Sequence, residues 1–579
     1  MAVHGTWRAA MALSAICVLA LSMVGSGSGA SEQRKRGGTL KLISAGDVDS
    51  VDPGRTYYSM GWEILTAVHR PLYSIPANST RTVPDLAAAM PKISGDGMTV
   101  TVKIKRGIRF GPPVNREVTS ADVKYAIERS FSVSVTNGYV SLYFSDLVGY
   151  PAKPPKTPKP VAGITTPDKY TIVFRLKQPG TTLASALVMT NTAPIPKEYA
   201  TKYDAKTSSD YGFYQAATGP YMFEAESSGN IKGKGYTPGR QMRLVRNPNW
   251  SARTDYRPAY VDVIELKQGF TDTAVGVRQI LNGTADGATD YATIPGPVLK
   301  QVTTSSRYKD NWYKWSNGIS YLGLNTRKAP FDNVNVRRAV NYVVDKNAIR
   351  LVAGGPLTGE IATHILGPEF KGKGFEAAGG LRFDPYASQN HAGDVNKAKA
   401  ELRKAGYADG LYDGPAITFY TFNVTPSPQQ GKVIAASLAK IGIRVNIKLA
   451  SIDAMFTKFC VVQRFLPHMC ALGWLPDFKD PVTMIDPLFS GKAINPNYTN
   501  NMSQFSDPAV NAAIDKAKRI RDPDVRYAAW GRIDQMITRA APIVPTNWST
   551  TVTIVSDRIV PGKSLWNAGL LDLSATSIK

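Results

Sequence analysis

Histidine and cysteine are both scarce in this chain: its 579 residues include 5 histidines and 3 cysteines. The histidines beyond the N-terminal region are far apart, at positions 69, 364, 391 and 468, and no His-Glu-x-x-His helix is present. Two cysteines close to His468 lack the paired spacing of a zinc module. The sequence therefore predicts no metal site built from protein ligands.

Motifs for nucleophilic catalysis and phosphate binding are also missing. The chain contains no Gly-x-Ser-x-Gly turn and no Gly-x-x-x-x-Gly-Lys-Ser/Thr loop. We therefore predict no catalytic residue and no cofactor, and any ATPase that works with this chain must be a separate protein. A secreted hydrolase remains the alternative, because paired carboxylates for sugar cleavage leave no fixed motif.

No internal stretch has the ~18 uninterrupted apolar residues that a membrane span needs. The one apolar run, residues 9–24, follows Arg8 and ends in the small-residue tract 25–30. A basic start, a short apolar run and a small-residue end are typical of a secretory signal peptide. We predict that residues 1–30 are this signal, cleaved after Ala30, and that the protein is exported; an uncleaved anchor is the alternative. Cys17 follows the bulky Ile16, which disfavours a lipid anchor.

Removal of that segment leaves two cysteines, Cys460 and Cys470. Cysteines close in sequence tend to pair in an oxidising compartment, so a disulfide is predicted. The alternative is two buried, inert thiols.

Acidic residues are outnumbered by basic ones, 45 to 69, which gives a formal net charge of +24. The basic residues are dispersed, whereas nucleic-acid binding needs a focused patch, so no nucleic-acid partner is predicted. A solvated surface is the simplest interpretation; attraction to anionic envelope polymers or to acidic ligands is the alternative.

Hydrophobic periodicity indicates an α/β fold. Apolar residues alternate as in strands at 39–43, 99–104 and 170–176, and a capped helix is predicted to follow Thr119. The proline-rich segment 151–160 is predicted to be an extended loop, and Asp47, Asp49 and Asp52 are interpreted as turn residues. In the second half, two helices are predicted to end at Gly406 and Gly442, a strand to follow at 443–449, and a late helix to span 524–540.

A series of short motifs occurs in a fixed order along nearly the whole chain. They are Gly-Gly-Thr-Leu at 37–40, Asp-Pro at 52–53, Leu-Tyr at 72–73, Pro-Asp-Leu-Ala at 84–87, Asp-Gly-Met-Thr at 96–99, Ile-Arg-Phe at 108–110, Thr-Ser-Ala-Asp-Val at 119–123, Thr-Gly-Pro-Tyr at 218–221, Arg-Asn-Pro at 246–248, Leu-Gly-Leu-Asn at 322–325, Pro-Phe-Asp at 330–332 and Val-Arg-Arg-Ala at 336–339. In this order they resemble the peptide/nickel-type (family 5) extracellular solute-binding proteins of bacterial ABC transporters, in the oligopeptide/dipeptide branch.

The resemblance implies a two-lobed fold of the large class II periplasmic-binding-protein type, with a subdomain inserted in lobe one. Lobe one is expected at 37–82, 216–316 and 548–579, the insert at 83–215 and lobe two at 317–547. It also implies a monomer that captures short peptides between its lobes and delivers them to the permease subunits of an ABC importer. A same-fold protein for a sugar, a chelated metal or an amine-bearing metabolite is the alternative.

The segment 473–481 is similar to the family's Gly-Trp-x-x-Asp-x-x-Asp-Pro motif. The resemblance implies that Asp477 receives a peptide's α-ammonium and that Trp474, with Gly473, lines the pocket. Tyr57 and Tyr58 are expected near the ligand from lobe one. Asn325 is expected to approach it after a strand that resembles one entering the cleft. In the alternative interpretation, Trp474 is a core residue and Asp477 caps a turn.

Overall fold

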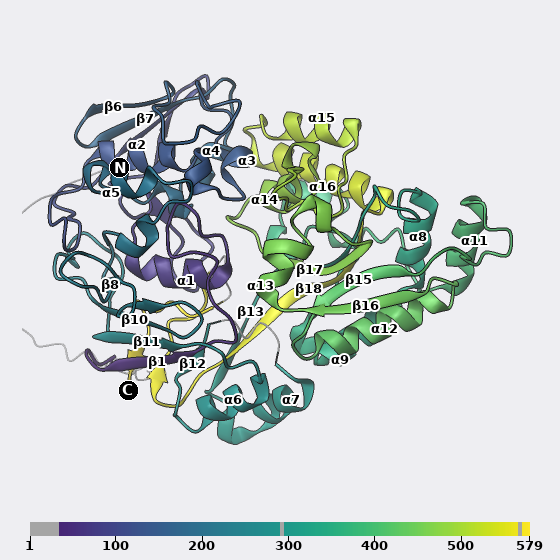
Figure 1. Ribbon diagram of the computed structural model, residues 1–579. Coiled ribbons are helices and arrows are strands. Elements are labelled where there is room, and N and C mark those ends of the chain that lie inside the picture. The colour runs from purple at the N-terminus through teal and green to yellow at the C-terminus, as the bar shows by residue number, and fades with distance from the viewer. Residues whose placement is uncertain (1–33, 290–293, 566–569) are drawn as a thin grey trace, which may run out of the picture.

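The computed structural model describes residues 34–289, 294–565 and 570–579 (Figure 1). The predicted signal peptide, its cleavage site and Cys17 lie outside these residues. Within the described ranges, no helix combines the length and the apolar character that crossing a membrane requires. We use the names lobe one, insert and lobe two for the residue ranges predicted above.

The sheet of lobe one has the strand order β12-β1-β11-β10-β8, with β9 paired to β10. The predicted strand at 39–43 is confirmed as β1, which pairs in parallel with β11 and β12. Leu40 and Leu42 point from β1 into a core that α1 covers, because alternate side chains of a strand face the same side. The elements of lobe one are β1 (Thr39–Ile43), α1 (Ser59–Val68), β2 (Tyr73–Ser74), β8 (Tyr221–Phe223), β9 (Tyr236–Thr237), β10 (Gln241–Arg246), β11 (Val263–Lys267), α6 (Thr273–Leu281), β12 (Gly287–Ala288), α7 (Gly296–Thr304), β19 (Ile559–Val560) and β20 (Ser577–Ile578).

The insert is built on the sheet β4-β5-β7-β6, which includes the two predicted strands β5 and β7. The predicted capped helix is α2: the backbone N–H of Thr119 donates to the Asp122 carboxylate at 2.8 Å, and Val123 and Ile127 are buried. The segment 151–160 forms a loop, as expected. The elements of the insert are β3 (Val83–Pro84), β4 (Lys92–Ile93), β5 (Thr99–Lys103), α2 (Ser120–Arg129), α3 (Val140–Tyr143), β6 (Ile164–Asp168), β7 (Thr171–Arg175), α4 (Thr182–Ala186) and α5 (Lys197–Asp204).

A buried ion-pair cluster joins the insert to lobe one. Arg129, at the end of α2, donates to both carboxylate oxygens of Asp52 at 2.8 and 2.9 Å, and Asp204 accepts from the same guanidinium. All three side chains are almost fully buried. The interpretation of Asp52 as a simple turn residue is therefore incomplete: it also accepts from the Gly54 N–H, but its charge is committed to Arg129.

The sheet of lobe two has the order β14-β18-β13-β17-β15-β16. Helix α11 begins after the N-cap Asp394, which accepts from the Lys397 N–H, as predicted from its sequence. Helix α12 ends at Ala439, slightly before the predicted stop, and β16 follows. The elements of lobe two are β13 (Trp312–Leu324), α8 (Val334–Val343), α9 (Lys346–Ala353), β14 (Gly359–Ile361), α10 (Lys373–Ala377), α11 (Val395–Lys404), β15 (Ile417–Phe422), α12 (Ser427–Ala439), β16 (Val445–Ala450), α13 (Ile452–Ala454), β17 (Met469–Trp474), α14 (Val482–Phe489), α15 (Pro508–Ala517), α16 (Pro523–Ala540) and β18 (Ile543–Ile554).

Two long antiparallel strands, β13 and β18, run from the sheet of lobe two toward lobe one (Figure 1). Each extends across a predicted lobe boundary, and their pairing register shifts between Ser316 and Ile319. Gly318 lies at this irregularity with φ +79°, and a Cβ there would come within 2.3 Å of the Trp474 carbonyl oxygen. The backbone at this crossing point therefore requires glycine.

Cys460 and Cys470 are joined by a disulfide in lobe two, as predicted. The bond connects the end of a π-helical turn, Met455–Phe459, to β17.

Replacing both cysteines by alanine is expected to lower the free energy of unfolding by about 2–3 kcal/mol, because the closed loop restricts the unfolded chain. Urea titration followed by tryptophan fluorescence measures the change. Thiol titration of the denatured, mature wild-type protein should find no free sulfhydryl; two free thiols would contradict the assignment.

Candidate functional site

Strand β17 and the loop after it position the predicted ligand residues. Trp474 ends β17 and pairs with Ile319 of β13. The following loop is held by Asp480, which accepts from the Val482 N–H at 2.9 Å and pairs with Arg526 at 2.8 Å. Asp480 thus anchors the start of α14, and Asp477 is presented from the fixed loop between these two points.

Asp477 lies where lobe two meets lobe one and the insert. Its side chain is 6% exposed. Its carboxylate accepts from the Tyr57 hydroxyl of lobe one at 2.9 Å and from the Tyr143 hydroxyl of the insert. Among the described residues, no lysine, arginine or histidine forms an ion pair with it. One carboxylate of lobe two is therefore held by two neutral donors from the opposite side.

Burial dominates the electrostatics of this carboxylate. It raises the Asp477 pKa to about 7, although the hydrogen bonds from Tyr143 and Tyr57 act to lower it. Burial and the Asp477 charge also raise the pKa of both tyrosines well above the usual value, so their hydroxyls remain donors. A carboxylate that is buried without a cation is costly, and a ligand ammonium would remove that cost.

Trp474 is half-buried beside the same tyrosine. Its ring meets the Tyr57 ring edge-on at 5.8 Å between centroids, and its Nε1–H donates to the Thr483 carbonyl at 2.7 Å. The indole is thus fixed in orientation while part of it stays accessible. The alternative that Asp477 caps a turn does not describe this loop, because its hydrogen bonds come from tyrosines and the capping role belongs to Asp480.

Tyr58 also lies at the lobe interface. Its ring packs against Phe456 of lobe two at 6.0 Å, and its buried hydroxyl has no hydrogen-bond partner among the described residues. Gly473 lies in β17 opposite Ser320, and a Cβ there would make only an ordinary contact, at 3.6 Å. A Cβ would therefore fit at position 473, and no close contact requires a glycine there.

Asn325 is not brought to this group. In the antiparallel pair, Trp474 lies opposite Ile319 whereas Leu324 lies opposite Met469, so Asn325 follows the other end of β13. There its amide donates to the Pro467 carbonyl at 3.1 Å and its side-chain oxygen accepts from the Arg327 N–H. Asn325 is therefore a buried residue that closes a turn away from Trp474, and its contact with a ligand stays a prediction.

Further contacts join the two sides of the interface, so the lobes are closed on each other. Lys518 donates to the Leu142 carbonyl at 3.0 Å, and Asn500 donates to the Gly138 carbonyl at 3.2 Å. In addition, the Arg521 guanidinium donates to the Gly95 carbonyl at 2.7 Å. Each of these bonds ends on a backbone carbonyl of the insert.

Sequence reasoning missed Tyr143 and Tyr498 near Asp477, and it gave Asp49 only the role of a turn residue. Burial, together with the charges of Asp49 and Asp477, raises the pKa of Tyr498. Asp49 is not only a turn residue, because its carboxylate accepts from the Thr56 hydroxyl and the Tyr57 N–H. No motif indicates Tyr143 or Tyr498, since both reach the site only through packing between distant segments.

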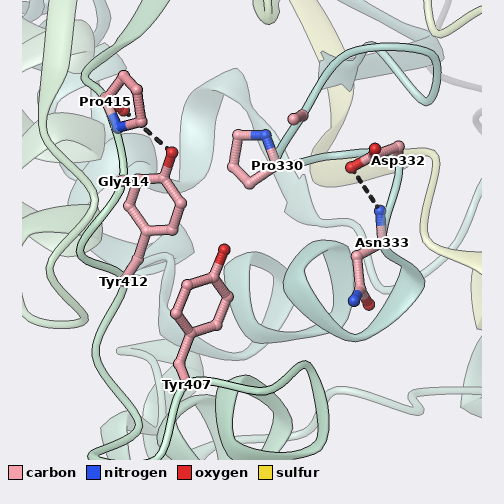
Figure 2. Close-up of a pocket in the computed structure, with 8 residues that line it drawn as sticks. Pro330, Asp332, Asn333, Tyr407, Tyr412, Gly414 and Pro415 are labelled. Carbon is pink, nitrogen blue, oxygen red and sulfur yellow. Dashed lines mark hydrogen bonds between the residues drawn. The ribbon is translucent and has the colours of Figure 1, made fainter.

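The described residues contain no group of His, Cys, Asp or Glu side chains that could hold a metal ion. A hollow of about 480 Å³ lies elsewhere in lobe two (Figure 2). In it, Tyr412 donates to the Pro415 carbonyl and Asp332 accepts from the Asn333 N–H. None of the predicted ligand residues lines this hollow, and we assign it no function.

The sequence matches a known protein family. The family described as "Bacterial extracellular solute-binding proteins, family 5 Middle" matches residues 81–496. The chain belongs to this family. The match covers most of the chain, and it includes Tyr143, Trp474 and Asp477.

Curated relatives and solved structures match most of the length of the chain. The chain is 24% identical to heme-binding protein A of Haemophilus influenzae, over 85% of this chain and 83% of the relative. It is also 24% identical to a dipeptide-binding protein of Pseudomonas aeruginosa, over 90% and 91%. The structure of "Clavulanic acid biosynthesis oligopeptide binding protein 2" matches with a TM-score of 0.79 at 27% identity, over 94% of this chain and 96% of that one.

The fold is therefore the two-lobed α/β fold of the family 5 periplasmic binding proteins. A Helicobacter pylori periplasmic binding protein in complex with the peptide STSA has the same fold, with a TM-score of 0.77 at 22% identity, over 94% of this chain and 98% of that one. The relatives and structures described above are all named as binding proteins, and none of them is named as an enzyme.

Proposed function

We propose that this protein is the extracytoplasmic binding component of an ABC importer, and that it holds a short peptide between its lobes for delivery to a membrane permease. Family membership supports the class of protein, and several relatives are named for dipeptides or oligopeptides. The observation that carries the ligand class is Asp477. This carboxylate of lobe two is buried, accepts hydrogen bonds from lobe one and from the insert, and has no cationic partner among the described residues.

The charge of Asp477 determines which kind of ligand it would bind. An α-ammonium that enters between the lobes would pair with Asp477 and could displace or share the tyrosine hydroxyls. The ring of Trp474 would then offer apolar contact to a side chain without selecting one shape. A sugar has no cation to offer, so Asp477 favours amine-bearing solutes over that alternative.

The test compares a tripeptide with its N-acetylated form on the mature wild-type protein. Calorimetry should detect binding of the free peptide, and acetylation should weaken it about 30-fold or more, since the cationic partner of a buried carboxylate is lost. Mass spectrometry should recover the peptide intact. Equal binding of both forms would contradict the role of Asp477, and cleavage of the peptide would favour the hydrolase alternative.

The raised pKa of Asp477 also predicts how the empty protein responds to pH. In the closed form its pKa is about 7. In an open form the carboxyl would be hydrated, with a pKa near its ordinary value of about 3.9. The closed state thus binds a proton more readily, so closure is favoured as the pH falls from 7 toward 4, by up to about tenfold per pH unit.

Small-angle scattering of the ligand-free protein should therefore give a smaller radius of gyration at about pH 5 than at about pH 8. The tyrosines that face Asp477 stay protonated in this range, so they do not contribute to the change. An Asp477→Asn variant serves as the control and should lose most of the response. An equal response in the variant would assign the effect to another group.

A further inference from the structure

The irregularity in β13 leaves Gly318 without a paired residue in either neighbouring strand. Pairing of β13 with β18 stops at Ser316 and resumes at Ile319, and only Ser549 lies between the two partner residues in β18. Pairing of β13 with β17 begins at Ile319. Gly318 therefore lies in a β-bulge, where it is buried. The extra residue of a bulge is left unpaired, so its backbone N–H depends on an acceptor outside the ladder.

The Glu369 side chain supplies an acceptor for this N–H. Its Oε1 accepts from the Gly318 N–H at 3.2 Å, across 51 residues of sequence. Glu369 lies in the single turn Pro368–Phe370 of lobe two. Burial raises the Glu369 pKa to about 7, although the backbone N–H groups of Glu369 and Gly318 act to lower it. The side chain offers an acceptor oxygen in either protonation state, so the contact does not depend on a charge.

The chain leaves space for the Glu369 side chain at Gly367. A Cβ there would collide with Glu369 Oε2 and would come within 2.9 Å of Trp548 Cδ1. Gly367 has a φ of −92°, which other residues also adopt, so the space rather than the backbone conformation requires a glycine. Trp548 lies in β18 opposite Ile319, so Gly367 and Trp548 together confine the Glu369 carboxylate beside the bulge.

The other side of Gly318 faces the start of the loop after β17. A Cβ at Gly318 would collide with the Trp474 carbonyl oxygen and would come within 2.7 Å of Leu475 Cδ2. The peptide group between Trp474 and Leu475 thus packs directly on the Gly318 backbone, with no side chain between them. Because groups packed this closely cannot move independently, a shift of the bulge would also shift the loop that leads from Trp474 to Asp477.

We propose that Glu369 is a positioning residue for the peptide site. By accepting from the Gly318 N–H it fixes the shape of the bulge, and the bulge in turn fixes the start of the loop that carries Asp477. This inference rests on the proposed function, because it assumes that Trp474 and Asp477 contact the ligand. Glu369 is assigned no contact with the ligand, so its effect on affinity passes through the backbone at Gly318.

The experiment separates the reach of the Glu369 side chain from its charge. Glu369→Gln keeps an oxygen acceptor at the same distance and loses the charge, whereas Glu369→Asp keeps the charge but is one methylene shorter and loses the contact with Gly318. Hydrogen–deuterium exchange of the ligand-free protein should be about three- to tenfold faster across residues 474–478 in Glu369→Asp and unchanged in Glu369→Gln. Calorimetry with Ala-Ala-Ala should show a loss of affinity of about the same size in Glu369→Asp and of less than about twofold in Glu369→Gln.

Asp394→Ala is the matched control, because it also removes a hydrogen bond from a side chain to a backbone N–H, that of Lys397, at a helix far from β13 (Figure 1). It should lower the melting temperature about as much as Glu369→Asp does, and leave exchange at 474–478 and peptide affinity unchanged. Unchanged exchange and affinity in Glu369→Asp, or equal defects in both Glu369 variants, overturn the inference and leave the proposed function intact. Failure of Ala-Ala-Ala to bind the wild-type protein contradicts the proposed function, and the exchange measurement still decides whether Glu369 positions the loop.

Discussion

Asp477→Ala is expected to weaken the binding of a short peptide by roughly 30-fold or more. The carboxylate is buried, and it accepts hydrogen bonds from two neutral hydroxyls. Since no described residue offers it a cation, a ligand ammonium would supply the missing positive charge. Removing one member of a buried charge pair costs about 2–5 kcal/mol, and ~1.4 kcal/mol corresponds to a tenfold change. Calorimetry on the purified variant measures the loss.

A double-mutant cycle separates this effect from a general disturbance of the loop. The acetylated peptide should lose comparable affinity for the wild-type protein, and the combination of variant and acetylated peptide should lose much less than the sum of the two effects. If the losses simply add, Asp477 and the amino terminus act independently. In that case Asp477 would have a structural role and the peptide would be held elsewhere.

Arg129→Met is expected to lower the free energy of unfolding by about 3–5 kcal/mol, because it leaves Asp52 and Asp204 buried without their cation. Burial alone would raise the Asp52 pKa, but the charge and hydrogen bonds of Arg129 outweigh it and hold the pKa below the ordinary value. Methionine keeps most of the side-chain volume, so the loss reports charge rather than a cavity. Urea titration monitored by circular dichroism measures it.

The pH dependence of this difference has a defined sign. In the wild type, a lowered folded-state pKa gives stability that is present above the unfolded value of about 3.9 and is lost as the pH falls further. In the variant, protonation of the unpaired carboxylates stabilises the folded state. The difference in free energy of unfolding between the wild type and the variant should therefore become smaller toward acidic pH. Lys206→Met breaks the exposed pair with Asp210 and should leave stability almost unchanged. A gap that widens on acidification would contradict the assignment.

Local sequence signals predicted several of the regular elements well. Thr119 with Asp122 and Asp394 with its following turn identified two helix starts, since side-chain caps act within a few residues. The alternation at 39–43 identified β1, because one face of that strand is buried. The motif at 473–481 located Trp474 and Asp477, and the ordered series of motifs gave the fold.

Contacts between distant segments could not be predicted in this way. Tyr143 reaches Asp477 across 334 residues of sequence, and Arg129 reaches Asp52 across 77. The order of motifs also says nothing about which end of β13 lies beside Trp474; the antiparallel register decides it and places Asn325 after the other end. Asp49 and Asp52 are three positions apart, yet Asp49 accepts from Thr56 and Tyr57 within its own loop, whereas Asp52 pairs with the distant Arg129.

The position of Trp474 next to the strand irregularity of β13 and β18 has a mechanical consequence. If the lobes rotate about a hinge at this crossing, the proposed ligand residues lie close to the rotation axis and are displaced only a little. Helices α11 and α12 lie far from the crossing and would sweep much longer ones (Figure 1). A small rotation close to a bound solute would then produce a large displacement at the outer edge of lobe two. A membrane partner could sense occupancy from that edge without touching the solute.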